Sequence, residues 1–150
     1  MLVKDVTDDA VTAATRSRNM AKIKSEDTGP ELVVRRLIHS LGYRYRLHKK
    51  DLPGKPDLVF GPRRKVIFVH GCYWHVHLRY DPSCRRARPP KSNIQYWGPK
   101  LERNFERDRT HLSRLAAEGW KVLVLWECEL KNASDIEIQI KEFLGPPRPA

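Results

Sequence analysis

Three histidines, two cysteines and two adjacent aromatic residues fall within one segment, HGCYWHVHLRYDPSC, which runs from His70 to Cys84. Thiols and imidazoles are ligands of zinc, and an imidazole can also take a proton from water near neutral pH. A hydrophobic core has no use for this mixture, and a solvated loop seldom carries Tyr73 and Trp74 side by side. The segment therefore indicates a metal site, a catalytic site or both.

The cysteines predict a structural zinc site with three sulfur ligands and one nitrogen ligand. The chain has 3 cysteines, an odd number that disulfide bonds cannot pair completely. The predicted ligands are Cys72, His77, Cys84 and, just past a later apolar run, Cys128, so that the ion would tie a long loop to the end of a strand. The alternative, a set of small hydrophobic core residues, suits Cys128 but not the two cysteines of a polar, basic loop.

Apolar spacing and end signals predict the helices that flank this segment. Thr28 and Glu31 have the spacing of a capping box, and the apolar residues after them recur at helical intervals. A second, longer helix is predicted over residues 99–118, and another capping box, formed by Ser134 and Glu137, predicts a last helix.

Four strands are predicted between these helices. Residues 43–47 alternate between apolar and basic types, and the runs 57–60 and 65–69 should form a hairpin. The run 120–127 is almost continuously apolar, which predicts a central strand covered on both faces. Because a helix joins the third strand to the fourth, those two strands should be parallel. The order αβββαβ with a final helix therefore predicts an α/β fold with a mixed sheet.

The composition predicts one soluble domain that binds a polyanion. Lys and Arg number 29 against 18 Asp and Glu, a formal net charge of +11, and the basic residues cluster with aromatic ones. This favours nucleic acid over a charge that serves solubility alone. No stretch predicts a membrane span or a signal peptide, so we expect a cytoplasmic protein. Residues 1–150 should comprise one domain, with an N-terminal arm (1–27), a core (28–145) and a tail (146–150).

Asp57, His70 and His75, which are not predicted zinc ligands, have the side chains that phosphodiester hydrolysis requires. This reaction needs hard oxygen ligands for magnesium, a base, and positive charge near the leaving oxygen. Asp57 begins a strand whose hairpin partner ends at His70, so their side chains should converge, and His75 has an imidazole that can act as the base. Asp57 taken alone is better explained as a turn residue after proline.

The segments PGKPDLVF, VIFVHGCYWHVH, NFERDR and GWKVLVLWECEL together resemble the very short patch repair (Vsr) endonucleases, over most of the chain from TRSRNM onwards. The resemblance implies a core similar to the PD-(D/E)xK restriction-endonuclease fold, which agrees with the αβββαβ order. It also implies flanking helices and a zinc-stapled loop. The sequence departs from that superfamily where Glu-x-Lys is expected, because it has Phe68, Val69 and His70 at those positions.

The resemblance implies a mismatch-specific DNA endonuclease. Such an enzyme nicks one strand on the 5′ side of the thymine in a T·G mismatch, the product of 5-methylcytosine deamination. By resemblance, Asp57 binds magnesium beside the backbone carbonyl of Val69, His75 is the general base, and His70 assists at the metal-bound water and the phosphate.

Three polar residues would support this site, according to the same resemblance. Glu31, Asn104 and Asp108 match positions that act through water or orient a histidine. Glu31 is also explained by its capping box, and Asp108 by a place on the exposed face of a long helix.

The family's structural zinc maps onto Cys72, His77 and Cys128. The second cysteine of its pattern falls near Arg79 here, and Cys84 is the cysteine that remains to complete the site.

The resemblance also implies how DNA would be held. Tyr73, Trp74 and Trp97 would enter the base stack from one groove, and a short basic helix with Arg16, Met20 and Ile23 would approach from the other. Trp97 and Met20 are equally explained by ordinary packing.

The expected partner is double-stranded DNA with a T·G mismatch, bound by a monomer that has no membrane association. A functional link to a cytosine-5 DNA methyltransferase and to mismatch-repair proteins follows from the same resemblance. The alternative is a zinc-stabilised DNA-binding module without catalysis, which explains the charge, the aromatic residues and the zinc ligands, but not Asp57, His70 and His75 together. A zinc hydrolase that holds its metal with these three residues is disfavoured by the net charge.

Overall fold

The computed structural model describes residues 27–88, 92 and 94–147. In chain order its helices and strands are α2 (Gly29–Ser40), β1 (Arg46–Leu47), β2 (Leu58–Phe60), β3 (Lys65–His70), α3 (Ile94–Ala117), β4 (Lys121–Trp126) and α4 (Ala133–Leu144). Short 3-10 turns lie between them, among them η3 (His77–Arg79), η4 (Arg85–Ala87) and η5 (Glu127–Lys131). The order confirms the predicted αβββαβ core with a final helix. Among the helices of the described residues, none is long and apolar enough to cross a membrane.

The four strands form one mixed sheet in the order β1-β2-β3-β4. The hairpin of β2 and β3 is antiparallel, and β3 runs parallel to β4 from Lys65 beside Lys121 to His70 beside Trp126. Both pairings confirm the prediction. The central place predicted for residues 120–127 is wrong, because β4 lies at one end of this strand order.

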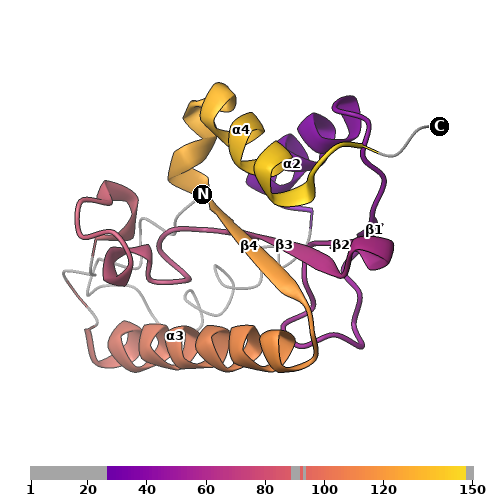
Figure 1. The fold of residues 1–150 in the computed structure, drawn as a ribbon. Helices are drawn as coiled ribbons and strands as arrows, with labels where there is room; N and C mark the ends of the chain where they lie inside the picture. The colour runs from indigo at the N-terminus through magenta and orange to yellow at the C-terminus, as the bar shows by residue number, and fades with distance from the viewer. Residues whose placement is uncertain (1–26, 89–91, 93, 148–150) are drawn as a thin grey trace.

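Helices cover both faces of the sheet, which explains why an edge strand is so apolar. Figure 1 shows α3 on one face, and α2 and α4 on the other. In β4, Leu123 and Leu125 pack into the cluster shared with α2 and α4, while Val122 and Val124 pack into the cluster that contains Leu115 of α3. The strand is therefore covered above and below, and only its outer edge lacks a strand partner within the described sheet.

The ends of the helices follow local hydrogen-bond chemistry. The hydroxyl of Thr28 accepts the N–H of Glu31 and begins α2, and Gly42 follows the helix with a φ of +96°, a conformation that suits glycine. The predicted cap at Ser134 is wrong. Asn132 begins α4 instead, because its side-chain oxygen accepts the N–H of Asp135.

Two predicted boundaries also differ from the structure. The long helix begins at Ile94, five residues before the predicted start at Pro99, and the burial of Trp97 in this first part favours the longer helix. Pro99 is the sixth residue of α3, so it leaves the carbonyl of Gln95 without the usual helical N–H, and its exposed position lets water satisfy that group. Of the predicted strand 43–47, only Arg46 and Leu47 pair with β2, since Tyr43 is buried in the core instead.

Candidate active site and metal centre

The predicted catalytic residues gather at one end of the sheet. Asp57 precedes β2, and because β2 is antiparallel to β3, the start of β2 lies beside the end of β3 at Val69 and His70. The parallel strand β4 ends at this same level, and the N-terminal turn of α2 carries Glu31 to it. The topology therefore brings together residues that are far apart in the sequence.

Asp57 is a largely buried carboxylate held by the backbone of β3. Its Oδ2 accepts the N–H of Val69 at 2.7 Å, and its side chain is 15% exposed. Burial raises the pKa of Asp57 to about 7, and Glu31 adds to the rise, while the Val69 N–H, His48 and His75 oppose it. A buried carboxylate of this kind gains from a nearby cation, so its oxygens suit a magnesium ion.

His75 and Asp108 form a hydrogen-bonded pair that can accept a proton. Nδ1 of His75 lies 2.6 Å from Oδ2 of Asp108, which projects from α3. Since a carboxylate accepts hydrogen bonds, Nδ1 carries the hydrogen and Nε2 is left with the lone pair of a base. The interpretation of Asp108 as a charge on an exposed helix face is wrong, because its side chain is 15% exposed and bound to His75.

His70 stacks on His75, with ring centroids 3.7 Å apart and planes 4° from parallel. His70 is buried, and burial, followed by the neighbouring His75 and His77, lowers its pKa well below the usual range. A neutral His70 beside His75 can donate one hydrogen bond without adding a second positive charge. His70, His75 and Asp108 place their ligand atoms within 4.8 Å of one another.

The other two supporting residues make direct contacts. The side-chain amide of Asn104 donates to the backbone carbonyl of Trp74 at 3.1 Å, so it fixes the loop next to His75. Glu31 is buried, accepts the N–H of Asp27 at 3.1 Å, and lies 2.6 Å from Nε2 of His48. Glu31 thus takes part in the helix start and also reaches toward the candidate active site.

His48 was missed by the motif analysis. It lies directly after β1, where the pairing of Leu47 with Leu58 puts it opposite Asp57, and its Nε2 is 3.9 Å from Oδ1 of Asp57. The one sequence signal was the pairing of the predicted strand 43–47 with the predicted strand 57–60. In an antiparallel pair, the residue that follows the first strand lies opposite the residue at the start of the second. Its type, a histidine before two lysines, gave no hint.

The four predicted zinc ligands come together in a second, closed cluster. The ligand atoms of Cys72, His77, Cys84 and Cys128 all lie within 4.8 Å of one another, and the three cysteines are free thiols. Tetrahedral zinc with bonds of about 2.3 Å needs sulfur atoms about 3.8 Å apart, so this spacing suits it. Cys84 joins the cluster although it is distant from the family's usual position.

The surroundings of this cluster also fit a cation. Burial raises the pKa of Cys72 and of Cys128, and Cys84 adds to the rise in both, although the hydrogen bond with Cys72 lowers the pKa of Cys128. The N–H of Cys128 donates to Sγ of Cys72 at 3.4 Å, and His77 stacks on Trp126 at 4.0 Å. Trp126, the last residue of β4, is therefore a half-buried wall of the cluster, whereas Trp120 lies in the hydrophobic core.

Relatives of this chain are found by sequence comparison. The family model described as DNA mismatch endonuclease Vsr matches residues 8–81. A relative from Xanthomonas oryzae pv. oryzae, Type II nicking enzyme V.XorIIP, is 48% identical over 138 residues, which cover 92% of this chain and 98% of the relative. The chain belongs to the Vsr family. The DNA mismatch endonuclease Vsr of Escherichia coli is 41% identical over 119 residues, 79% of this chain and 73% of that protein.

A solved structure shares the fold of this Vsr-family chain. The catalytic domain of homing endonuclease I-Bth0305I superposes with a TM-score of 0.53 at 21% identity, over 78% of this chain and 94% of that domain. At this level of identity the likeness concerns the fold, and it agrees with the predicted endonuclease-like α/β core.

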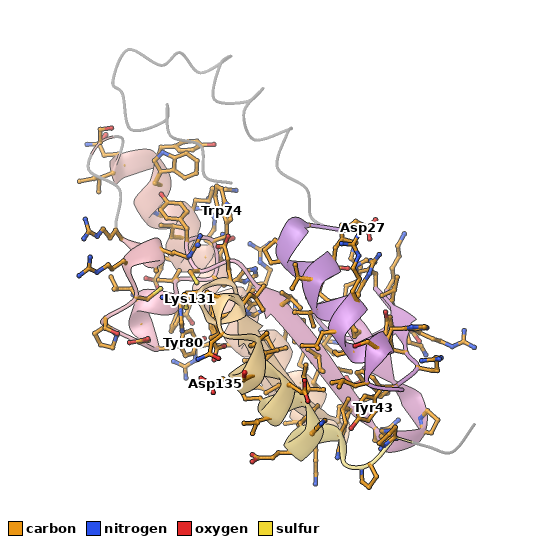
Figure 2. All side chains as sticks on the ribbon, turned by 90° about the horizontal axis from the view of Figure 1, so that it is seen from above. Asp27, Tyr43, Trp74, Tyr80, Lys131 and Asp135 are labelled. Carbon is orange, nitrogen blue, oxygen red and sulfur yellow. The ribbon has the colours of Figure 1, made fainter. Side chains whose placement is uncertain are left out.

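Three aromatic residues of this Vsr-family chain form one group beside the candidate active site. Tyr73 and Trp74 are half-buried and packed edge to face, with ring centroids 5.2 Å apart, and Trp97 lies 5.5 Å from Trp74. Trp97 is 1% exposed, so in this conformation it backs the other two rings. Figure 2 shows Trp74 and Asp27 at the same end of the molecule, away from Tyr43. The predicted contacts Arg16, Met20 and Ile23 lie outside the described residues.

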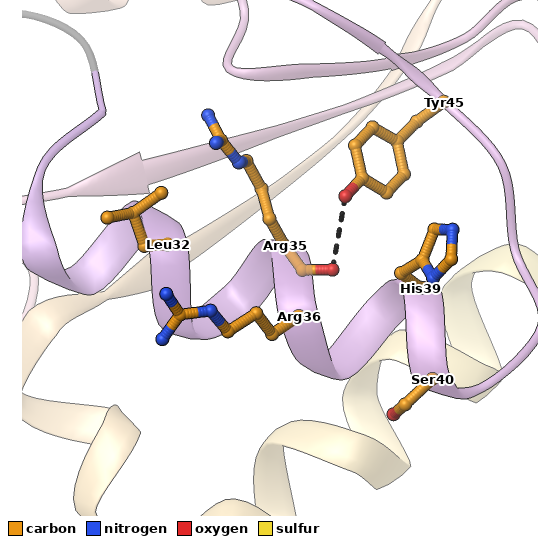
Figure 3. Close-up of a pocket in the computed structure, with 6 residues that line it drawn as sticks. All are labelled: Leu32, Arg35, Arg36, His39, Ser40 and Tyr45. Atoms are coloured by element: carbon orange, nitrogen blue, oxygen red, sulfur yellow. Dashed lines mark hydrogen bonds between the residues drawn. The ribbon is translucent and has the colours of Figure 1, made fainter.

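A separate hollow of about 380 Å³ lies along α2, lined by Leu32, Arg35, Arg36, His39, Ser40 and Tyr45 (Figure 3). The hydroxyl of Tyr45 donates to the carbonyl of Arg35 at 3.2 Å. The hollow extends toward the C-terminal end of α2, whereas Glu31 and the candidate active site lie at the N-terminal end of that helix. None of the predicted site residues lines it.

Proposed function

We propose that this Vsr-family chain nicks DNA on the 5′ side of the thymine in a T·G mismatch by magnesium-dependent phosphodiester hydrolysis, and so begins very short patch repair. The observation that carries the proposal is the His75–Asp108 pair, 2.6 Å apart, next to the neutral His70 and the buried Asp57. A module that only binds DNA needs no base oriented by a carboxylate, which argues against that alternative.

Asp57 would hold the magnesium together with the carbonyl of Val69, and Glu31 would support the site from α2. When bound, the ion would neutralise charge on the scissile phosphate and lower the pKa of bound water. The contact between the Val69 N–H and Asp57 favours this assignment, because it keeps the carboxylate beside that residue.

The proton transfer would be carried out by the histidines. Nε2 of His75 would take the proton of the attacking water, and Asp108 would stabilise the imidazolium that forms. His70, kept neutral by burial, would donate a hydrogen bond to the phosphate or to the water. The rings of His70 and His75 are stacked 3.7 Å apart, so two positive charges there would repel each other. A neutral His70 beside a proton-accepting His75 is therefore the favourable combination.

The cysteine cluster would hold one structural zinc. Its ligands Cys72 and His77 alternate along the chain with His70 and His75, so the ion would fix the loop on which the base stands. Zinc binding would therefore contribute folding free energy rather than chemistry.

The duplex would be opened at the mismatch by Tyr73 and Trp74, backed by Trp97, while the arm formed by residues 1–27 would bind the other groove as part of a monomer. Inserting aromatic rings costs a few kcal/mol in base stacking. A T·G pair loses less on opening than a matched pair, which would give selectivity. Deaminated 5-methylcytosine links such an enzyme functionally to a cytosine-5 DNA methyltransferase and to mismatch-repair proteins.

A panel of matched and mismatched duplexes tests the function. Single-turnover nicking of T·G, T·A and C·G duplexes of one sequence, with magnesium, should be fast only for T·G and cut 5′ to the thymine. Trp74→Ala should reduce the preference for T·G about tenfold or more, whereas Lys121→Ala, an exposed charge at the far end of β4, should leave it unchanged. Equal rates on T·G and T·A would defeat the mismatch assignment, and binding without any cleavage would favour the DNA-binding module.

A further inference from the structure

His48 connects the two carboxylates of the candidate active site from outside the sequence motifs. Its Nε2 lies 2.6 Å from Oε2 of Glu31 and 3.9 Å from Oδ1 of Asp57. The side chain of His48 is 10% exposed, that of Glu31 is 2% exposed and that of Asp57 is 15% exposed. One buried ring nitrogen therefore faces both carboxylates.

The backbone at His48 is held in an unfavourable conformation. Its φ is +45°, in the left-handed region, which is unfavourable for a residue other than glycine. The N–H of His48 donates to the carbonyl of Asp57 at 3.3 Å, so the conformation is enforced by the strand pairing that brings the two residues together. Strain that the surroundings maintain next to a reactive site favours a functional role for the side chain.

The contacts of Glu31 define what the ring does. Oε1 of Glu31 accepts the N–H of Asp27, and Oε2 accepts both Arg35, at 3.1 Å, and His48. Because an ionised carboxylate only accepts hydrogen bonds, Nε2 of His48 carries the hydrogen that is shared with Glu31. The ring therefore acts as a donor that fixes the direction of Oε2.

The neighbouring groups exclude a metal-ligand role for His48. Asp27, Glu31 and His48 place their ligand atoms within 4.8 Å of one another, which would suit a metal ion. However, the guanidinium of Arg35 already lies 2.6 Å from Oδ1 of Asp27 and 3.1 Å from Oε2 of Glu31. This cation satisfies the two carboxylates, so the group is an ion-pair network.

We propose that His48 is a positioning residue of the endonuclease, which orients the Glu31 carboxylate beside Asp57 through its Nε2–H and thereby shapes the site that receives magnesium. This rests on the proposed function and extends it to a residue outside the family's motifs. Residues that orient metal-binding carboxylates typically change metal affinity or activity about 10- to 100-fold when they are removed. A role through Glu31 predicts an effect on magnesium, with little effect on DNA affinity.

Three substitutions separate the hydrogen bond from the backbone strain. His48→Ala and His48→Gly both remove the donor, but glycine also relieves the left-handed φ, while His48→Gln keeps an N–H at a similar reach. His39→Gln, at an exposed histidine on the last turn of α2, is the matched control. For each variant, single-turnover nicking of a T·G duplex would be measured against magnesium concentration, together with the duplex Kd and the Tm.

Loss of the donor should raise the magnesium concentration for half-maximal nicking about 10- to 100-fold in both His48→Ala and His48→Gly, with the duplex Kd within about twofold of the parent. His48→Gln should recover most of the loss, and His39→Gln should match the parent. Parent-like magnesium dependence in His48→Ala, an equal loss in His48→Gln, or a duplex Kd that weakens in step with the rate would each overturn the proposal.

Magnesium binding to the DNA-free protein, measured by calorimetry, keeps the two proposals distinguishable. If the parent nicks no duplex, the proposed function fails on its own. His48→Ala should still weaken magnesium binding, and His48→Gln should preserve it. Identical binding by parent and His48→Ala would defeat the role of His48 whatever the activity.

Discussion

Residues of one loop contribute to two side-chain clusters that differ in solvent exposure and in chemistry. His70 and His75 belong to the cluster that we propose to be catalytic, the catalytic cluster. Cys72 and His77, which alternate with them along the chain, belong to the cysteine cluster. The catalytic cluster is open on one side, with the His75 side chain 31% exposed, whereas the cysteine cluster is closed and walled by Leu78, Ala87 and Trp126.

The two clusters also satisfy their polar groups differently. In the catalytic cluster, Asp57 accepts a hydrogen bond from the Val69 N–H, and His75 is hydrogen-bonded to Asp108. In the cysteine cluster, thiols face one another, and burial raises the pKa of Cys72 and of Cys128. We propose that the first cluster moves protons with its own residues and that the second is stabilised by a bound cation. Because of this difference, substitutions at neighbouring residues of one loop can test chemistry and folding separately.

The largest expected effect separates two histidines that lie two positions apart. His75→Ala should lower the nicking rate about 10³-fold, because it removes the general base, while zinc content and Tm stay near the parent values. His77→Ala should instead lose zinc and stability. Rates, metal analysis and melting curves of both variants would check this, and a His75→Ala protein that nicks at the parent rate would contradict the assignment of the base.

Duplex affinity provides the control for this pair. Affinity rests mainly on phosphate contacts and released counterions, so His75→Ala should bind the T·G duplex nearly as well as the parent. A large loss of binding would mean that His75 holds the duplex rather than the proton.

A smaller effect is expected from the closed cluster. Cys128→Ser should reduce bound zinc from about one ion per chain and lower the free energy of unfolding by roughly 3 kcal/mol, since structural zinc contributes directly to folding. Unfolding in urea and elemental analysis of the dialysed protein would measure both. Ser113→Ala, at an exposed position on α3, is a matched control, and unchanged stability in Cys128→Ser would exclude a structural role for the metal.

Much of the catalytic cluster was predictable because it depends on strand ends. The hairpin puts Asp57 and His70 at one end of the sheet, and the crossover helix puts Cys128 of the cysteine cluster at the same end; residue type then indicated their chemistry. The partner of His75 came from family resemblance instead, because a carboxylate on a long helix has no sequence signal for the direction in which it points. Only tertiary packing turns Asp108 toward the loop.

The misses have related physical causes. Covered faces, rather than a central place, make β4 apolar, and local pattern cannot separate the two. The cap of α4 is Asn132 because its side chain reaches the Asp135 N–H, whereas the spacing at Ser134 was matched by chance. His48 escaped because its importance comes from the register of a two-residue strand, and short pairings leave almost no periodic signal.

The smallest expected effect is on the free energy of unfolding, which the buried carboxylate of Asp57 should lower at high pH. Burial raises the pKa of Asp57 to about 7 from an ordinary 3.8, so the folded protein holds a proton there that the unfolded chain has lost. When Asp57 is protonated, the folded protein does not have to bury a charged carboxylate. This stabilisation of the fold is fully present below about pH 4 and is lost as the pH rises to about 7. Asp57→Asn, which keeps an acceptor for the Val69 N–H, has no such loss.

Asp57→Asn should therefore be more stable than the parent at pH 8 by roughly 1–3 kcal/mol, with the difference shrinking toward zero as the pH falls to 4. Urea unfolding between pH 4 and 8, in magnesium-free buffer without a chelator so that zinc is retained, would measure the difference. Asp51→Asn, at an exposed carboxylate nearby, should show no such trend. Magnesium should narrow the gap at pH 8, because it binds the ionised Asp57 better than the amide. A stability difference between Asp57→Asn and the parent that is independent of pH would mean that burial does not raise the pKa of Asp57. The contrast between an open catalytic cluster and a closed, metal-stabilised cluster would then lose its electrostatic basis.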